Sequence, residues 1–432
     1  MMESGWGLLG PETIGSTRRT RTLGLGRSVR LFNNLAVPGM GGVWFGKQLL
    51  LATLGVSVAE KARAAGAKVR NIETANAIEA LACWLSFTGN DWKSDDRLRG
   101  KTKLQRLKDT KDYSFKRFRQ RKFYVTQPMR MACVETLPSL GFVDTDGTRF
   151  SGFRVSRAGQ EFLEAAFKDF TPYHRNVNVI DHLVKWVRGE DAPINSNELR
   201  DALSPIVTLQ ERTRKILKER LLQGNQRREN SLSWMETIRT TPGTKPDWEK
   251  KPLNIQDDVH WDDLKAGALF FKTRDVAVEV LDALETHIGN KGEGCRFSLK
   301  DQVPKSVGDA VIELQKAAEA FLDVKRKDED ANRFCRDCVI PDNQKVLQTL
   351  VERDGRVLRL AGQYVLPGPA FRGALLVESE DDDGNGSPEA ASTIPLPDGI
   401  SYRMRNLYLL NLDLHDRLDT WLNANANTGE NQ

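Results

Sequence analysis

The sequence has few cysteines and no long apolar segment, and each shortage narrows the range of functions. Only 5 of its 432 residues are cysteines, and such an odd, sparse set excludes a disulfide framework and is typical of the reducing cytoplasm. The longest uncharged stretch, 31–46, has 16 residues, fewer than the roughly 20 that a membrane-spanning helix needs. The first residues show no signal-peptide pattern. We therefore expect a cytoplasmic protein that has no membrane contact.

Histidine is equally scarce, and its positions form no catalytic or metal-binding pattern. None of the 5 histidines takes part in an HxH, HExxH or HxxxH arrangement, the spacings that many zinc enzymes use. The nearest approach to a zinc set combines His287 and Cys295 with Cys335 and Cys338, but 39 residues separate the two pairs. We expect free buried thiols and no cofactor, and a structural zinc on these four side chains is the alternative.

Sequence motifs of enzymes are also missing. Asp247, Asp263 and Lys265 match the bare spacing of a PD-(D/E)xK nuclease motif, in which carboxylates hold a metal ion that activates water. That motif requires paired strands, whereas the local patterns here indicate a loop and a helix. The glycine-rich stretch 38–42 lacks the GxxxxGK[ST] spacing of a phosphate-binding loop. A binding role is thus expected, and a metal-dependent nuclease is the third function considered.

Positive charge, by contrast, is concentrated in one segment. Residues 93–122 contain 13 Lys/Arg and 4 Asp, a net charge of +9, although the whole chain carries only +5. Clustered cations attract a polyanion because binding releases its counterions. Aromatic residues interleaved with the cations either stack on bases or pack the segment onto the core. These aromatic residues are Tyr113, Phe115, Phe118, Phe123 and Tyr124.

The segment 126–167, which follows directly, has the strongest local structure signals. Thr126 is a suitable helix N-cap, and Pro128 fits the first turn, where its missing N–H has no partner. Apolar residues at helical spacing then form one face, and Gly141 ends this helix. A second helix is expected after the cap residue Ser156, with an apolar side as well. The apolar residues of the two helices are Cys133, Val134, Leu137 and Leu140, then Phe162, Leu163 and Phe167.

Between these helices the pattern predicts a two-stranded ribbon over 142–144 and 150–155. Asp146-Gly147 is a strong signal for a tight hairpin turn, because such a turn needs a positive φ that glycine adopts easily. Helix, ribbon and helix is the layout of a winged helix, and the string LPSLGFVDTDG with SRAGQEFL resembles winged helix-turn-helix DNA-binding domains.

The resemblance implies a recognition helix in a DNA groove and a wing along the backbone. Only Gln127 and Arg130 on that helix suit base edges, and Glu135 would repel phosphate, so we expect a grip on the backbone rather than readout of bases. The predicted DNA-contacting residues are Lys116, Arg117, Arg119, Arg121, Lys122, Gln127, Arg130, Arg149 and Arg154.

The expected fold is mainly α, with a winged-helix domain, a large helical remainder and a small α+β C-terminal domain. In the last part the order of helix, Asp354-Gly355 and ribbon is compatible with a second winged helix. The expected divisions are a flexible basic arm at 1–30, the winged-helix domain with the basic patch at 31–170, a helical domain at 171–339 with a linker near 240–258, and the C-terminal domain at 340–432 with a disordered acidic loop at 378–398.

Helices are predicted at 43–63, 71–87, 177–188, 196–203, 208–223, 261–271, 274–288, 306–325, 343–352 and 402–423.

Two functions of different classes fit these patterns. The first is a non-enzymatic subunit of a multi-protein complex that grips double-stranded DNA with the winged helix and the adjacent basic patch. This layout is similar to that of subunits of bacterial antiphage defence systems, which would make other protein subunits its partners. The alternative is an interaction scaffold, in which the winged helix docks on a protein and the patch neutralises an acidic surface.

Overall fold

A computed structural model of the chain describes residues 21–110, 112–172, 177–190, 194, 196–241, 243, 245–290, 296–371, 388 and 393–426. The described residues are mainly helical and contain two small antiparallel sheets, which confirms the predicted mainly α class. The chain divides into two compact units. Unit 1 comprises Met1–Leu31 and Ala266–Ser379, and unit 2 comprises Phe32–Lys265 and Glu380–Gln432. In the part of the chain that the structure describes, no helix has the length and apolar character to cross a membrane.

These units differ from the predicted divisions, because each is assembled from two separate stretches. The predicted C-terminal domain at 340–432 has residues in both units, and the described residues 21–30 of the predicted arm belong to unit 1. The boundary reflects which apolar faces meet, and a helix late in the chain can cover one formed early. Most of the predicted acidic loop at 378–398 lies outside the described residues.

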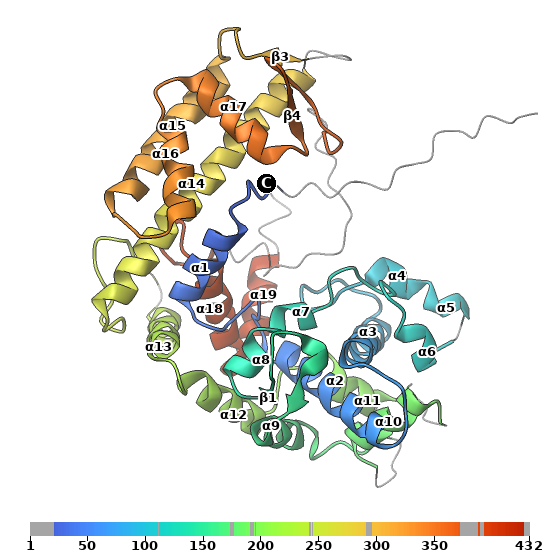
Figure 1. The fold of residues 1–432 in the computed structure, drawn as a ribbon. Coiled ribbons are helices and arrows are strands. Elements are labelled where there is room, and N and C mark those ends of the chain that lie inside the picture. The colour runs from blue at the N-terminus through green and yellow to red at the C-terminus, as the bar shows by residue number, and fades with distance from the viewer. Residues whose placement is uncertain are drawn as a thin grey trace, which may run out of the picture. The chain divides into compact units, whose positions relative to one another are not determined.

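Unit 2 is built around α2 (Gly46–Ala64) and α3 (Asn71–Gly89), which are buried over most of their length. Their backbones approach closely at Gly55, where an added Cβ atom would lie 2.5 Å from the Cα of Ala75. Figure 1 shows α10 and α11 beside the pair, among the shorter helices of this unit. The shorter helices are α4 (Lys101–Gln105), α5 (Leu107–Thr110), α6 (Phe115–Phe118), α7 (Arg130–Cys133), α8 (Thr136–Ser139), α9 (Arg157–Phe167), α10 (Val179–Arg188), α11 (Asn197–Leu203), α12 (Glu211–Leu222), α13 (Gln226–Thr240), α18 (Tyr402–Leu414) and α19 (Leu418–Ala426).

The predicted first helix of the segment 126–167 is divided into α7 and α8. It begins at Arg130, and its N-cap residue is Met129, which makes no side-chain cap, so the predicted cap at Thr126 is wrong. The second helix, α9, begins as predicted: the Ser156 side chain accepts a hydrogen bond from the Gly159 N–H at 3.0 Å.

The ribbon between these helices is shorter than predicted. β1 (Val143–Asp144) pairs antiparallel with β2 (Arg154–Val155), and Phe150–Gly152 forms a 3₁₀ turn where a strand was expected. Gly147 has no positive φ, so the predicted tight turn at Asp146-Gly147 is wrong. The buried Asn71 side chain donates hydrogen bonds to the carbonyl oxygens of Phe150 and Phe153, at 3.2 and 2.8 Å. These long-range bonds hold the residues before β2 in a turn.

The C-terminal helix α18 completes the core of unit 2. The Arg403 guanidinium binds the Glu135 carboxylate with contacts of 3.2 and 2.6 Å. The buried Asp413 accepts a hydrogen bond from the backbone N–H of Gly46 at 2.8 Å, at the first residue of α2. A carboxylate is stabilised there by the unpaired N–H groups and the dipole of the helix.

In unit 1, the helices α15, α16 and α17 pack together with the C-terminal part of α14. Of these, α15 and α16 are direct neighbours (Figure 1). The Phe270 ring lies 5.6 Å from Phe321 and 6.5 Å from Phe334, measured between ring centroids, and thereby joins α14, α15 and α16. The helices of this unit are α15 (Lys305–Asp323), α16 (Glu329–Cys338) and α17 (Asn343–Asp354), and α1 (Gly26–Ala36) and α14 (Asp258–Gly289) have residues in both units.

Unit 1 also contains a three-stranded antiparallel sheet with β5 in the centre. The strands, in the order in which they neighbour one another, are β3 (Phe297–Ser298), β5 (Tyr364–Pro367) and β4 (Leu358–Ala361). The β4–β5 hairpin is the ribbon predicted after Asp354-Gly355, and Gly355, with φ +60°, follows the end of α17. Gly362 in the hairpin turn has φ +61°, which glycine adopts at no steric cost.

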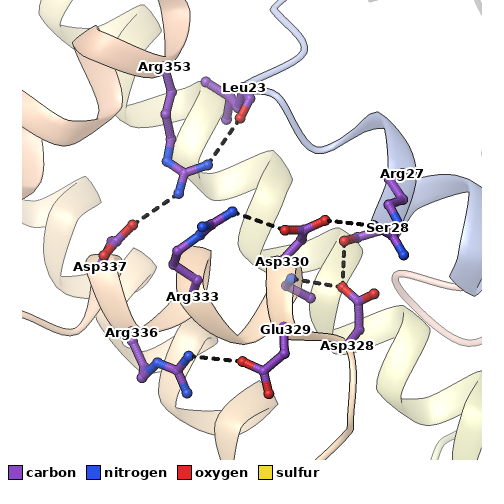
Figure 2. Close-up of polar contacts among 11 residues, drawn as sticks. Leu23, Arg27, Ser28, Asp328, Glu329, Asp330, Arg333, Arg336, Asp337 and Arg353 are labelled. Carbon is purple, nitrogen blue, oxygen red and sulfur yellow. Dashed lines mark hydrogen bonds and ion pairs between the residues drawn. The ribbon is translucent and has the colours of Figure 1, made fainter.

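The described end of the predicted basic arm is attached to unit 1 (Figure 2). Ser28 donates a hydrogen bond to Asp328 at 2.6 Å, and Asp328 also caps α16 through the Ala331 N–H at 2.8 Å. Arg353 donates to the carbonyl oxygen of Leu23, a fully buried residue. Residues 21–30 are therefore held by side-chain contacts, whereas the sequence analysis expected a flexible segment.

Most of the predicted helices are confirmed, and the differences lie at their junctions. The predicted helices at 261–271 and 274–288 form one helix, α14, and the predicted helix at 402–423 is divided into α18 and α19. The helices α1, α4, α5, α6, α13 and α16 were not predicted.

Candidate nucleic-acid interface

An open, positively charged depression of about 550 Å³ lies in unit 2 between α4, α5 and α6. We call it the basic depression. Five of its lining side chains are cationic and one is a carboxylate. It is lined by Lys103, Arg106, Leu107, Asp112, Ser114, Lys116, Arg117, Gln120, Lys122 and Phe123. All of these residues belong to the segment 93–123, at or beside the predicted basic patch.

Apolar side chains at helical spacing give the depression its shape. Leu104 and Leu107 are buried beneath α4 and α5. Phe115 and Phe118 anchor α6, since both rings meet the Trp186 ring edge-on, at centroid distances of 5.3 and 5.7 Å. With the apolar faces turned inward, the lysines and arginines between them face the solvent. The interleaved aromatic residues thus attach the patch to the core, one of the two roles expected for them.

Most cations of the depression have no anionic partner within the described part of the chain. Among the described residues, Lys103, Arg106 and Lys122 make no ion pair, whereas Arg117 lies 3.9 Å from Asp112. Hydrogen bonds from Ser114, helped by the charge of Arg117, lower the pKa of Asp112. Asp112 is therefore ionised at neutral pH, and the depression keeps a large excess of positive charge.

Several predicted DNA contacts are instead used within unit 2. Arg119 forms an ion pair with Glu73 on α3 at 3.0 Å. The Arg130 side chain donates a hydrogen bond to Asn76 at 2.5 Å and lies over the Phe150 ring, while Gln127 is buried. These two side chains, the only ones on the predicted recognition helix that suit base edges, are turned into the protein. Sequence spacing alone could not show this, because their surroundings come from α3 and from the β1–β2 connection.

The remaining predicted contacts are exposed, except the half-buried Arg117. Lys116, Arg121, Lys122 and Arg149 are solvent-exposed, and Lys116 and Lys122 line the basic depression. Arg154 is exposed as well, and its guanidinium lies 3.1 Å from the exposed carboxylate of Asp146. Such a surface ion pair is weak, so Arg154 can bind another anion in place of Asp146.

A buried carboxylate that the sequence analysis missed positions the chain next to the depression. Glu79 on α3 accepts hydrogen bonds from the Tyr124 hydroxyl at 2.5 Å, from the Arg130 N–H at 3.2 Å and from the Met129 N–H. Burial raises the pKa of this carboxyl. Glu79 therefore takes the place of the expected cap at Thr126. The signal was available, since it is a lone acidic residue in the apolar stretch 75–85.

The candidate nuclease residues are engaged in local structure. Asp247 accepts hydrogen bonds from the N–H groups of Glu249 and Lys250. Asp263 is buried and pairs with Arg227 at 2.8 Å, and the Lys265 ammonium lies over the Trp261 ring. These contacts account for all three side chains without a metal ion.

The candidate zinc residues show no arrangement for a metal either. Cys335 and Cys338 lie on α16 and are buried, and burial raises the pKa of Cys335 to about 12 and that of Cys338 further. His287 lies edge-on to the Phe297 ring, and Cys295 is outside the described residues. Over the described ranges, no group of three or more His, Cys, Asp or Glu side chains is placed to hold a metal ion.

The glycine-rich stretch 38–42 serves packing. Gly39 and Gly41 have positive φ, and an added Cβ atom would lie 1.9 Å from the Ser139 hydroxyl and 2.4 Å from the Ala132 carbonyl oxygen, respectively. The N-terminus of the following helix, α2, is already occupied by Asp413.

Comparison of the chain with protein-family models, with curated proteins and with solved structures found no match.

Proposed function

We propose that the chain is a non-enzymatic, double-stranded DNA-binding protein that grips the phosphate backbone with the basic depression. The observation that carries the proposal is the group of lysines and an arginine in the depression that lack an anionic partner among the described residues. Cations that a protein leaves unpaired on one concave surface are available to replace the counterions of a polyanion.

The adjoining segment 126–167 supports this proposal as a winged helix. It has the order of helix, antiparallel ribbon and helix, and Arg149 and Arg154 are exposed at the ribbon. We assign these two arginines to backbone contacts along the wing, and the depression supplies most of the affinity. Because Gln127 and Arg130 are turned into unit 2, binding is expected to be independent of base sequence.

A role within a multi-protein complex, as in bacterial antiphage defence, extends the same proposal. It rests on the size of the helical remainder, for which DNA contact alone gives no reason. The scaffold alternative would use the depression for an acidic protein surface, and the experiment below distinguishes the two.

The test is a salt titration of binding to random duplex DNA, followed by fluorescence anisotropy. If the four cations Lys103, Arg106, Lys116 and Lys122 and the two wing arginines each contact a phosphate, log affinity falls with log salt with a slope of about −5.4. Lys116→Glu combined with Lys122→Glu removes two of these six contacts, which should reduce the slope to about −3.6 and weaken binding at low salt.

A matched control is Lys250→Glu, which reverses an exposed lysine of the same unit outside the depression. It should leave both the affinity and the slope close to those of the wild type. If wild-type protein has no duplex affinity at low salt, the DNA proposal fails and the scaffold alternative is favoured. Equal effects of the control and the depression variants would also contradict it.

A further inference from the structure

The sheet of unit 1 presents one face to its own core and the other to solvent. The register pairs Tyr364 of the central strand with Ser298 on one side and Ala361 on the other, and pairs Leu366 with Arg359. Directly paired residues of antiparallel strands lie on the same face of a sheet. Tyr364, Leu366 and Arg359 therefore share one face, and Arg296, two residues before Ser298, joins them.

Burial confirms which face is turned outward. Phe297, Leu358 and Val365 of the opposite face are completely or almost completely buried. Arg296 and Arg359 are exposed, and Tyr364 is half-buried. The outer face thus has an aromatic ring on the middle strand and an arginine on each side of it. We call it the outer sheet face.

The two charged residues that the register places on this face, Arg296 and Arg359, are both cationic. The segments 296–300 and 356–367 also contain Lys300 and Arg356, and they contain no carboxylate. The Arg296 guanidinium lies over the Tyr364 ring at 4.1 Å from the ring centroid. This contact places the cation over the ring, so the two side chains form one stacked pair, and a base can be added on its outward surface.

We propose that the outer sheet face binds single-stranded nucleic acid. Unpaired bases stack on aromatic rings and on guanidinium planes, and flanking cations bind the phosphates. In a duplex the base faces are stacked on one another, so the Tyr364 ring would have nothing to stack on. An acidic protein segment would match the charge but would leave the ring unused, and a flat aromatic partner with negative charge matches both.

This proposal is independent of the basic depression, which belongs to unit 2. If both hold, the chain has a site for duplex backbone in one unit and a site for unpaired strand in the other. That combination is suited to nucleic acid that contains both forms, such as a duplex with a single-stranded extension.

The test uses the full-length chain and a fluorescein-labelled oligothymidine of about 16 nucleotides, a site size typical of such surfaces. Tyr364→Ala should weaken binding by about 5- to 150-fold, the range found when one stacking side chain is removed. Tyr364→Phe keeps the ring and should retain the affinity. The affinity of both variants for a duplex of equal length should match that of the wild type.

Arg359→Glu provides a second variant at an exposed position, where misfolding is not expected, and it should also weaken oligothymidine binding. Its control is Lys327→Glu, which makes the same charge change at an exposed residue of unit 1 between α15 and α16. If Tyr364→Ala and Arg359→Glu bind oligothymidine as tightly as the wild type, or if the wild type does not bind it at low salt, the proposal is overturned.

The outcomes also separate this proposal from the proposed function. Loss of duplex binding in the depression variant, with unchanged oligothymidine binding in Tyr364→Ala, overturns only the inference about the sheet. If the wild type has no duplex affinity but binds oligothymidine, and Tyr364→Ala loses that binding, the proposal for the outer sheet face is supported and the role of the depression is overturned.

Discussion

Asp413 is a buried acid whose ionisation is linked to the stability of unit 2. It is only 4% exposed, and burial raises its pKa to about 6 although the Gly46 N–H and nearby arginines favour the carboxylate. The native state therefore binds a proton more tightly than the unfolded chain does. Stability from this group is present below the unfolded pKa of 3.8 and is lost as the pH rises through about 6.

We predict that the wild type loses about 2 kcal/mol between pH 4 and pH 6.5 relative to Asp413→Asn, since this range covers most of the interval between the two pKa values and each unit of pKa difference corresponds to about 1.4 kcal/mol. Asparagine keeps an oxygen for the Gly46 N–H but does not titrate. Urea unfolding followed by tryptophan fluorescence measures the difference, because 8 of the 9 tryptophans belong to unit 2. Parallel pH profiles of the two proteins would contradict the prediction.

The neighbouring base Lys47 does not interfere in this pH range. Burial lowers its pKa to about 8, which is below the unfolded value, so its contribution to stability changes only as the pH rises above neutrality. The two titrations are thus separated by about two pH units.

At the scale of elements, the start of α7 depends on a side chain of another helix. Glu79 on α3 accepts the N–H groups of Met129 and Arg130 and the Tyr124 hydroxyl. A helix as short as α7 has little stability of its own. The segment from Tyr124 to α7, which borders the basic depression, is therefore held in place mainly by this carboxylate and by burial.

We predict that Glu79→Ala destabilises unit 2 by about 2–5 kcal/mol, because it leaves buried donors without an acceptor and creates a cavity. Hydrogen exchange should show the Met129 and Arg130 amides losing protection first. Glu79→Gln is the control, since it keeps the shape and one carbonyl oxygen and should cost less. If the alanine variant protects these amides as the wild type does, Glu79 does not hold α7.

At the scale of the whole molecule, unit 2 requires the last described helices of the chain. α18 supplies Arg403, which pairs with Glu135, and Asp413, which binds the first residue of α2. Much of its apolar surface is also buried, including Leu407, Leu409 and Leu410. A domain assembled from two distant stretches cannot complete its core until both are present.

We predict that a chain ending at residue 392 cannot fold unit 2, because it lacks α18 and α19. Near-UV circular dichroism and tryptophan fluorescence should report loss of the packed core, while unit 1 keeps its helices, as judged by far-UV signal and hydrogen exchange at α15. A chain ending at Ala426 is the control and should retain unit 2. Native tryptophan signals in the shorter chain would contradict the assignment of α18 to this core.

The sequence by itself determined the helical class, most helix positions and the segment in which positive charge is concentrated. These features are local: α3 follows from apolar residues at helical spacing, α2 follows from its apolar composition, and the charge of 93–122 is a property of consecutive residues. The ribbon at β4–β5 could be predicted for the same reason, from its alternating β-forming side chains, although the Asp354-Gly355 signal marks the end of α17 and not the hairpin turn.

Only the tertiary structure decided which cations remain unpaired and which stretches form a unit. Arg119 and Arg130 resemble the neighbouring cations in the sequence, but Arg119 pairs with Glu73 and Arg130 donates a hydrogen bond to Asn76, both on α3. Lys116 and Lys122 instead line the depression. The pairing of Asp413 with the start of α2 joins residues 367 positions apart. Such contacts depend on which faces meet after folding, and no local pattern contains that information.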